Sequence, residues 1–68
     1  MGSRARPTLA EYNAAFTARA ELYRAEAKCL RELAETASIP MLRHELLEMA
    51  EDRESLADSI EGLRFRDD

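Results

Sequence analysis

Apolar side chains return every seven residues along the first half of the chain. The central row consists of Leu9, Phe16, Tyr23, Leu30 and Ala37. Beside it, on the same face, lie Tyr12, Ala20, Ala27, Leu33 and Ala34. A row with this period is typical of a helix that packs lengthwise against others, so the sequence predicts a helix over residues 9–37. Thr8 and Glu11 fit a capping box, in which each side chain binds a free amide at the start of a helix.

A second apolar stripe runs through the second half of the chain and predicts another helix, over residues 39–62. Its members are Leu42, Leu46, Met49, Leu56, Ile60 and Leu63. Arg53 occupies a position where the stripe requires an apolar residue. Ala50 and Ala57 lie beside the stripe, where small side chains allow helices to approach closely. Gly62 is expected to cap the C-terminal end of this helix.

Between the two stripes, Pro40 marks a reversal of the chain. Proline lacks the amide hydrogen that a helix interior needs, and it keeps the preceding residue out of the α region. The first helix should therefore end near Ala37, and the second should begin with Ser38 as its cap and Pro40 in its first turn. The sequence thus predicts an all-α fold, an antiparallel two-helix hairpin over residues 8–63. We expect a disordered basic tail at 1–7 and a frayed tail at 64–68.

Two helices can cover only one side of each other, so part of the apolar surface should stay exposed in a single hairpin. Leu22, Cys29 and Leu47 lie on the outer flanks of the two stripes and are the clearest examples. We therefore expect a homodimer in which two hairpins form a four-helix bundle, or else a complex with another helical protein. The residues expected at this interface are Phe16, Leu22, Tyr23, Cys29, Leu30, Leu47 and Arg53.

Arg53 is the polar exception in the second stripe. A cation at a seam between helices lowers stability unless it is paired or reaches solvent. In an antiparallel hairpin Glu26 lies opposite Arg53 and is its natural partner, with the Tyr23 ring placed for a cation–π contact. We interpret this pair as a device that fixes the register of the helices, and contact with a ligand is the alternative.

The charges are unevenly distributed. The net charge is −4, and residues 40–61 carry seven acidic residues against only Arg43 and Arg53. Such a surface repels phosphate backbones and anionic lipid, which argues against nucleic-acid and membrane binding. The first helix carries one basic stripe, which we interpret as an ion-paired, solvated face, with a small RNA-binding or regulatory hairpin dimer as the alternative. This stripe consists of Arg24, Lys28 and Arg31.

The sequence offers no set of residues for catalysis. His44 and Glu48 have the spacing of a zinc-protease motif, but the second histidine that the metal needs is missing, so we interpret His44 as an exposed side chain. We interpret Cys29, the one cysteine, as a small buried apolar residue, with a reactive thiol or a link between two chains as alternatives. We expect no enzyme and no cofactor. Because neither a secretory signal nor a membrane-spanning apolar run is evident, we expect a cytoplasmic protein.

A group of packing residues surrounds the turn at Pro40. They are Tyr23, Arg24, Ala27, Cys29, Leu33 and Ala34 before the turn, and residues 46–51 after it. With these residues the chain resembles, over about residues 20–57, a set of short helical-hairpin proteins of alphaproteobacteria whose function is not established. Those proteins usually have an acidic residue directly before the turn proline, where this chain has Ile39. The resemblance implies the hairpin fold and assigns no catalytic or ligand-binding residue.

Overall fold

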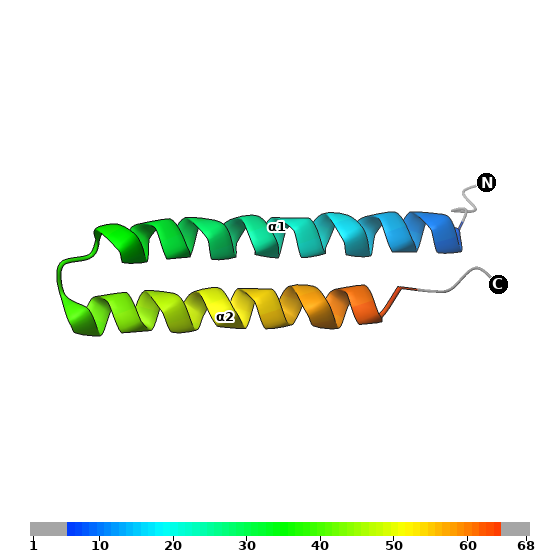
Figure 1. Ribbon diagram of the computed structural model, residues 1–68. Helices are drawn as coiled ribbons and strands as arrows, with labels where there is room; N and C mark the ends of the chain where they lie inside the picture. Colours follow the sequence, from blue (N-terminus) through cyan, green and yellow to red (C-terminus); the bar gives the residue numbers. More distant parts are fainter. Residues whose placement is uncertain (1–5, 65–68) are drawn as a thin grey trace.

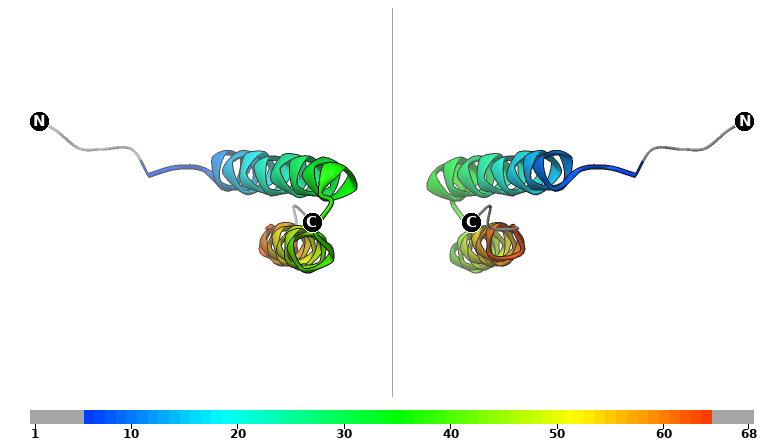
Figure 2. Two further views of the ribbon diagram at one scale, coloured as in Figure 1. Left: turned by 90° about the vertical axis from the view of Figure 1, so that its left-hand side faces the viewer. Right: turned by 90° about the vertical axis from the view of Figure 1, so that its right-hand side faces the viewer.

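The computed structural model describes residues 6–64, which form two helices (Figure 1). α1 spans Leu9–Thr36 and α2 spans Pro40–Gly62. The two helices run antiparallel and lie side by side, so the beginning of α1 and the end of α2 meet at the same end of the molecule (Figures 1 and 2). The predicted all-α antiparallel hairpin is therefore confirmed. The tail residues 1–5 and 65–68 lie outside the described part of the chain.

α1 begins at a capped N-terminus. Thr8 has extended backbone angles, and its hydroxyl oxygen accepts a hydrogen bond from the backbone N–H of Glu11 at 3.1 Å. The Thr8 hydroxyl also donates to the Glu11 carboxylate at 3.4 Å. The capping box is thus formed in one direction only, because the Glu11 carboxylate binds the Thr8 side chain and not its amide.

The turn between the helices is held by groups of both helices. The Thr36 hydroxyl donates to the carbonyl oxygen of Leu33 at 2.9 Å, and the Arg43 guanidinium donates to the carbonyl oxygen of Ala37 at 2.7 Å. A side chain from the first turn of α2 therefore satisfies a carbonyl group at the end of α1.

The start of α2 differs from the prediction. Its capping residue is Ile39, which forms no side-chain cap, so the predicted cap by Ser38 is wrong. Pro40 lies in the first turn of α2 as predicted, and since it has no N–H, one fewer donor needs a partner there. At the other end, α2 includes Gly62, and the capping residue Leu63 has right-handed backbone angles (φ −85°, ψ −6°). Gly62 is therefore not the C-terminal cap.

The contact between α1 and α2 has alanine at its centre. Within residues 6–64 every fully buried residue is an alanine, and these are Ala20, Ala27, Ala34, Ala50 and Ala57. We call these five residues the alanine seam. Half-buried residues of the predicted stripes alternate with them, namely Phe16, Tyr23 and Leu30 on α1, Ala37 directly after α1, and Leu46, Arg53 and Ile60 on α2. Alanine allows the backbones to approach closely, so larger side chains are held at the margins of the contact.

The alanine seam corrects the predicted orientation of α2. The sequence pattern placed Ala50 and Ala57 beside the packed stripe, but both are completely buried. Four members of that stripe are instead 41–60% exposed, and they are Leu42, Met49, Leu56 and Leu63. Met49 and Leu56 directly precede Ala50 and Ala57, and one residue turns a helix by about 100°, so they lie to one side of the contact.

Candidate functional site

The alanine seam has two flanks of different character. On α1, Arg24 follows the seam-lining residue Tyr23 and Leu22 precedes it, so the helical turn of about 100° per residue places them on opposite sides. The same holds one heptad later for Arg31 and Cys29, on either side of Leu30. Charged side chains therefore collect on one flank and apolar side chains on the other.

The first side, which we call the ionic flank, is crossed by ion pairs between the helices. The Arg24 guanidinium lies 3.1 Å from a carboxylate oxygen of Asp58 and also contacts Glu61, and Arg31 contacts Glu54. The hydrogen bond from Arg31 lowers the pKa of Glu54 below its ordinary value of 4.5. The hydrogen bond to Glu61 raises the pKa of Arg24, and the one to Glu54 raises the pKa of Arg31. Because these groups are exposed, water and salt screen the attraction.

These pairs bear on the basic stripe proposed for nucleic acid. Arg24 and Arg31 both donate to carboxylates of α2, whereas helical spacing alone predicts Glu21, Glu32 and Glu35 of α1 as partners of the basic stripe. Lys28, the third member, forms no ion pair within residues 6–64. To bind phosphate, Arg24 and Arg31 would have to leave carboxylates that already satisfy them.

The second side, which we call the apolar face, carries large side chains with nothing over them. Its members are Leu22, Cys29 and Leu33 on α1, Leu42, Met49 and Leu56 on α2, and Leu63 directly after α2. Leu22 and Leu33 are more than half exposed. The last four of these residues are each seven positions apart, so they form a straight row along α2 and its capping residue, which we call the α2 row.

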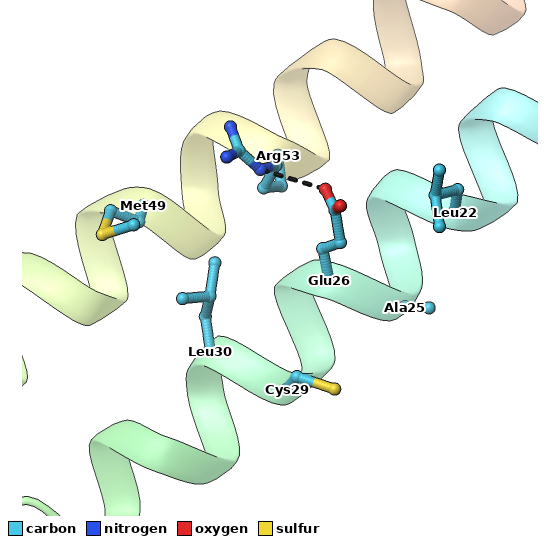
Figure 3. Close-up of a pocket in the computed structure, with 7 residues that line it drawn as sticks. All are labelled: Leu22, Ala25, Glu26, Cys29, Leu30, Met49 and Arg53. Carbon is cyan, nitrogen blue, oxygen red and sulfur yellow. Dashed lines mark ion pairs between the residues drawn. The ribbon is translucent and has the colours of Figure 1, made fainter.

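A hollow lies within the apolar face (Figure 3). α2 contributes Met49 and Arg53 to its wall. The rest of the wall comes from α1, and its residues are Leu22, Ala25, Glu26, Cys29 and Leu30. The Cys29 sulfur points away from α2 (Figure 3). The lining is almost entirely apolar, and its charged members are Glu26 and Arg53.

Arg53 is paired as the sequence predicts. Its Nε atom lies 3.1 Å from a carboxylate oxygen of Glu26, and the pair bridges the two helices at the edge of the hollow (Figure 3). The side chains are 37% and 44% exposed, so neither charge is removed from water in a single hairpin. The two charges cancel, and the apolar face therefore carries no net charge at this point.

The residues predicted for the interface lie in three different places. Phe16, Tyr23, Leu30 and Arg53 are half-buried between the helices. Leu22 and Cys29 are on the apolar face, whereas Leu47 lies on the ionic flank, in a shallow hollow shared with Arg31 and Arg43. The expectation that Leu22, Cys29 and Leu47 stay exposed in a single chain is confirmed, and the interpretation of Cys29 as a small buried apolar residue is wrong for this hairpin, because its position on the outer side of α1 leaves it exposed. The interface predicted from sequence omitted the α2 row as an exposed surface, although its seven-residue spacing is visible in the sequence.

The remaining candidate residue is His44, from the incomplete zinc-binding spacing. His44 is exposed and lies 3.0 Å from Glu48, one helical turn away. Among residues 6–64, no three side chains of the metal-binding types come together. In the same part of the chain, neither helix is long and apolar enough to cross a membrane.

Comparison with known proteins adds no further assignment. The chain matches no protein-family model, no curated protein and no solved structure. The resemblance to alphaproteobacterial hairpins therefore stays a prediction. The geometry itself describes a small helical hairpin whose large apolar side chains lie mostly on its surface.

Proposed function

We propose that the chain is an interaction protein, which associates with other helices through its apolar face. The observation that carries this proposal is the contrast in burial. The fully buried residues of the described chain are all alanines, while six leucine and methionine side chains of the apolar face are 41–60% exposed. Exposure of so large an apolar surface to water is unfavourable, and a further helix packed against this surface would exclude the water.

The small buried core of the hairpin supports the same function. Two helices of 28 and 23 residues with only alanine fully buried between them gain little from burial, because alanine has a small side chain. Covering the apolar face adds the large side chains to a shared core. Association would therefore contribute to the fold as well as to the role of the protein.

The nucleic-acid alternative is less well supported. It depends on Arg24, Lys28 and Arg31, of which two are already bound to carboxylates across the ionic flank. The acidic residues that bind them would also face an approaching phosphate backbone. We therefore keep association between helices as the proposed function.

The experiment is a measurement of mass by sedimentation equilibrium across a wide range of protein concentration. A mass above that of one chain, which falls on dilution, is the expected result. Two methionines of α2 provide a matched pair of variants. Met49 belongs to the apolar face, whereas Met41 is 73% exposed at the turn and outside it.

Met49→Glu should weaken association at least tenfold, because it places an unpaired carboxylate in the contact, and Met41→Glu should leave it unchanged. Circular dichroism of both variants shows whether the helices are retained. A helical protein with the mass of one chain at every concentration, and with no partner recovered by affinity purification, would contradict the proposal. Equal effects of the two variants would also contradict it.

A further inference from the structure

The hollow on the apolar face has the geometry of a socket for a side chain. In packed helices, one side chain inserts between four residues of the facing helix, at positions i, i+3, i+4 and i+7. Four residues that line the hollow on α1 have this spacing, and they are Leu22, Ala25, Glu26 and Cys29. Two of them are small, which leaves room for a large side chain from another helix.

The α2 row has the matching shape and period. Its four large side chains are seven residues apart, which is also the distance from one such socket to the next along α1. In this antiparallel hairpin, residues at the same height have numbers that add up to about 80, since the sum is 79 for Glu26 and Arg53 and 82 for Arg24 and Asp58. The centre of the hollow, between residues 25 and 26, is therefore about level with residues 54 and 55, and Leu56 is the member of the α2 row nearest to that height.

We propose that the occupant of the apolar face is a second copy of this chain, related by a two-fold axis parallel to the helices. This inference rests on the proposed function and specifies its partner. The axis preserves height, so Leu56 of each copy enters the hollow of the other. Met49 and Leu63 then meet the groups of four residues one heptad away on either side, which are Cys29, Glu32, Leu33 and Thr36 for Met49 and Ala15, Ala18, Arg19 and Leu22 for Leu63. Both turns lie at the same end of the resulting four-helix bundle, and α1 of one copy packs antiparallel to α2 of the other.

The size and charge of the face fit a second copy. Six leucine and methionine side chains each expose on the order of 100 Å², so a pair buries about 1,200 Å², above the roughly 1,000 Å² that a specific interface needs. The chain has a net charge of −4, but the charges of Glu26 and Arg53 cancel each other at the hollow. A second copy can therefore approach the hollow itself without direct repulsion.

The other two-fold arrangement fits less well. An axis perpendicular to the helices would place the turns at opposite ends and stack α1 on α1 and α2 on α2. The hollow of one copy would then face the hollow of the other, and the two α2 rows would meet large side chain against large side chain. Only the parallel axis brings the large side chains of α2 to the small residues of α1.

A disulfide test distinguishes these arrangements. In the proposed bundle, Cys29 of one copy is level with Asp52 of the other and lies on the same side of their contact. The test variant is Asp52→Cys, mildly oxidised and analysed as intact mass with and without reductant. Within one chain Cys29 points away from α2, so a bond to the thiol introduced at position 52 can form only between chains (Figure 3).

Two controls fix the register. Ser59→Cys places a thiol one heptad away on the same side of α2, about 10 Å too far along the helix for a disulfide. The unchanged chain has only Cys29, and the two α1 helices lie diagonally across the proposed bundle, about 14 Å apart. Neither control should form a covalent dimer.

Each outcome decides one point. A covalent dimer of Asp52→Cys alone, linked through residues 29 and 52, supports the proposed bundle. A covalent dimer of the unchanged chain or of Ser59→Cys, in preference to Asp52→Cys, overturns it in favour of another arrangement. If the reduced protein is a dimer but none of the three chains is linked, the arrangement is wrong and the proposed function stands. If the reduced protein has the mass of one chain, the second copy is excluded as the occupant.

Discussion

The two flanks of the alanine seam border the same helix contact and are completed in different ways. On the ionic flank, long side chains of α1 reach across to carboxylates of α2, and the charges are satisfied within one chain. On the apolar face, side chains of similar size extend from both helices and find no partner. Both arrangements have the same cause, which is the close approach of the helices at the alanine seam. It leaves no room between the backbones for larger side chains, so these lie on the two flanks.

The difference lies in what each kind of side chain needs. An arginine and a glutamate require one partner group each, which the neighbouring helix supplies at the margin of the contact. A leucine requires surrounding atoms on all sides, and two helices cannot provide them at the margin. The charges of one flank are therefore satisfied within the hairpin, whereas the large apolar side chains of the other stay partly exposed.

The largest expected effect is a change to the seam itself, because both flanks depend on it. Ala57 is completely buried, and Ala57→Leu would force the helices apart. We expect a loss of about 2 kcal/mol in the free energy of unfolding, as is typical of overpacked cores. Urea unfolding followed by circular dichroism measures it. Ala14→Leu, the same substitution at an exposed position of α1, should change stability by much less, and equal losses would contradict the importance of the seam.

The second prediction compares the flanks directly through two leucines of α2. Leu56 on the apolar face and Leu47 on the ionic flank are 41% and 39% exposed, so their surroundings differ more than their exposure. Leu56→Gln should weaken association at least tenfold, about 1.4 kcal/mol, whereas Leu47→Gln should not change it measurably. Sedimentation equilibrium measures both. If Leu47→Gln weakened association more than Leu56→Gln, Leu47 would belong to the interface, as the sequence predicts, and the division into flanks would be contradicted.

The sequence was sufficient to predict the helices, the reversal at Pro40 and the pairing of Glu26 with Arg53. These follow from local rules and from the antiparallel register. It was not sufficient to predict which side of α2 faces α1, because alanine and leucine both count as apolar in a periodic pattern. Whether an alanine lies at the centre of a contact or beside it depends on the distance between the backbones. That distance is a property of the packed pair and not of either helix alone.

The same limit applies to the ionic flank. Arg24 has Glu21 one turn away on its own helix, and helical spacing alone predicts this residue as its partner. In the structure it binds Asp58 and Glu61, because the close approach of the helices brings two carboxylates of α2 within reach of its guanidinium. The partner of a surface charge thus follows from the packing of the seam and was not accessible from spacing along one helix.

The third prediction concerns the charged pair on the apolar face. The double variant Glu26→Leu and Arg53→Leu removes both charges from a surface that would be dehydrated by a second copy. Association should tighten by about 1 kcal/mol, because the desolvation of an ion pair is avoided, and the hairpin should remain folded. If the pair fixes the register, the variant should form more than one arrangement, visible as additional amide peaks in NMR spectra. Weaker association with a single set of peaks would contradict this role.

The smallest effect is expected on the ionic flank, and it depends on pH. The hydrogen bond from Arg31 holds the pKa of Glu54 below 4.5, so the folded chain favours the charged carboxylate. The resulting stabilisation is present above pH 4.5 and is lost as the pH falls through the lowered pKa, because the proton then binds and weakens the pair. At neutral pH, Glu54→Gln should therefore be slightly less stable than the unchanged chain in urea unfolding, and the difference should close in acid, where protonated glutamate resembles glutamine. Glu45→Gln, on a part of α2 where the described residues offer no ion pair, should show no such convergence.

Added salt should narrow the difference in stability between Glu54→Gln and the unchanged chain at neutral pH, since the pair of Arg31 and Glu54 is exposed, whereas association through the apolar face should not weaken with salt. Opposite responses to salt would thus separate the two flanks by their chemistry, and a common response would show that a single type of interaction governs both.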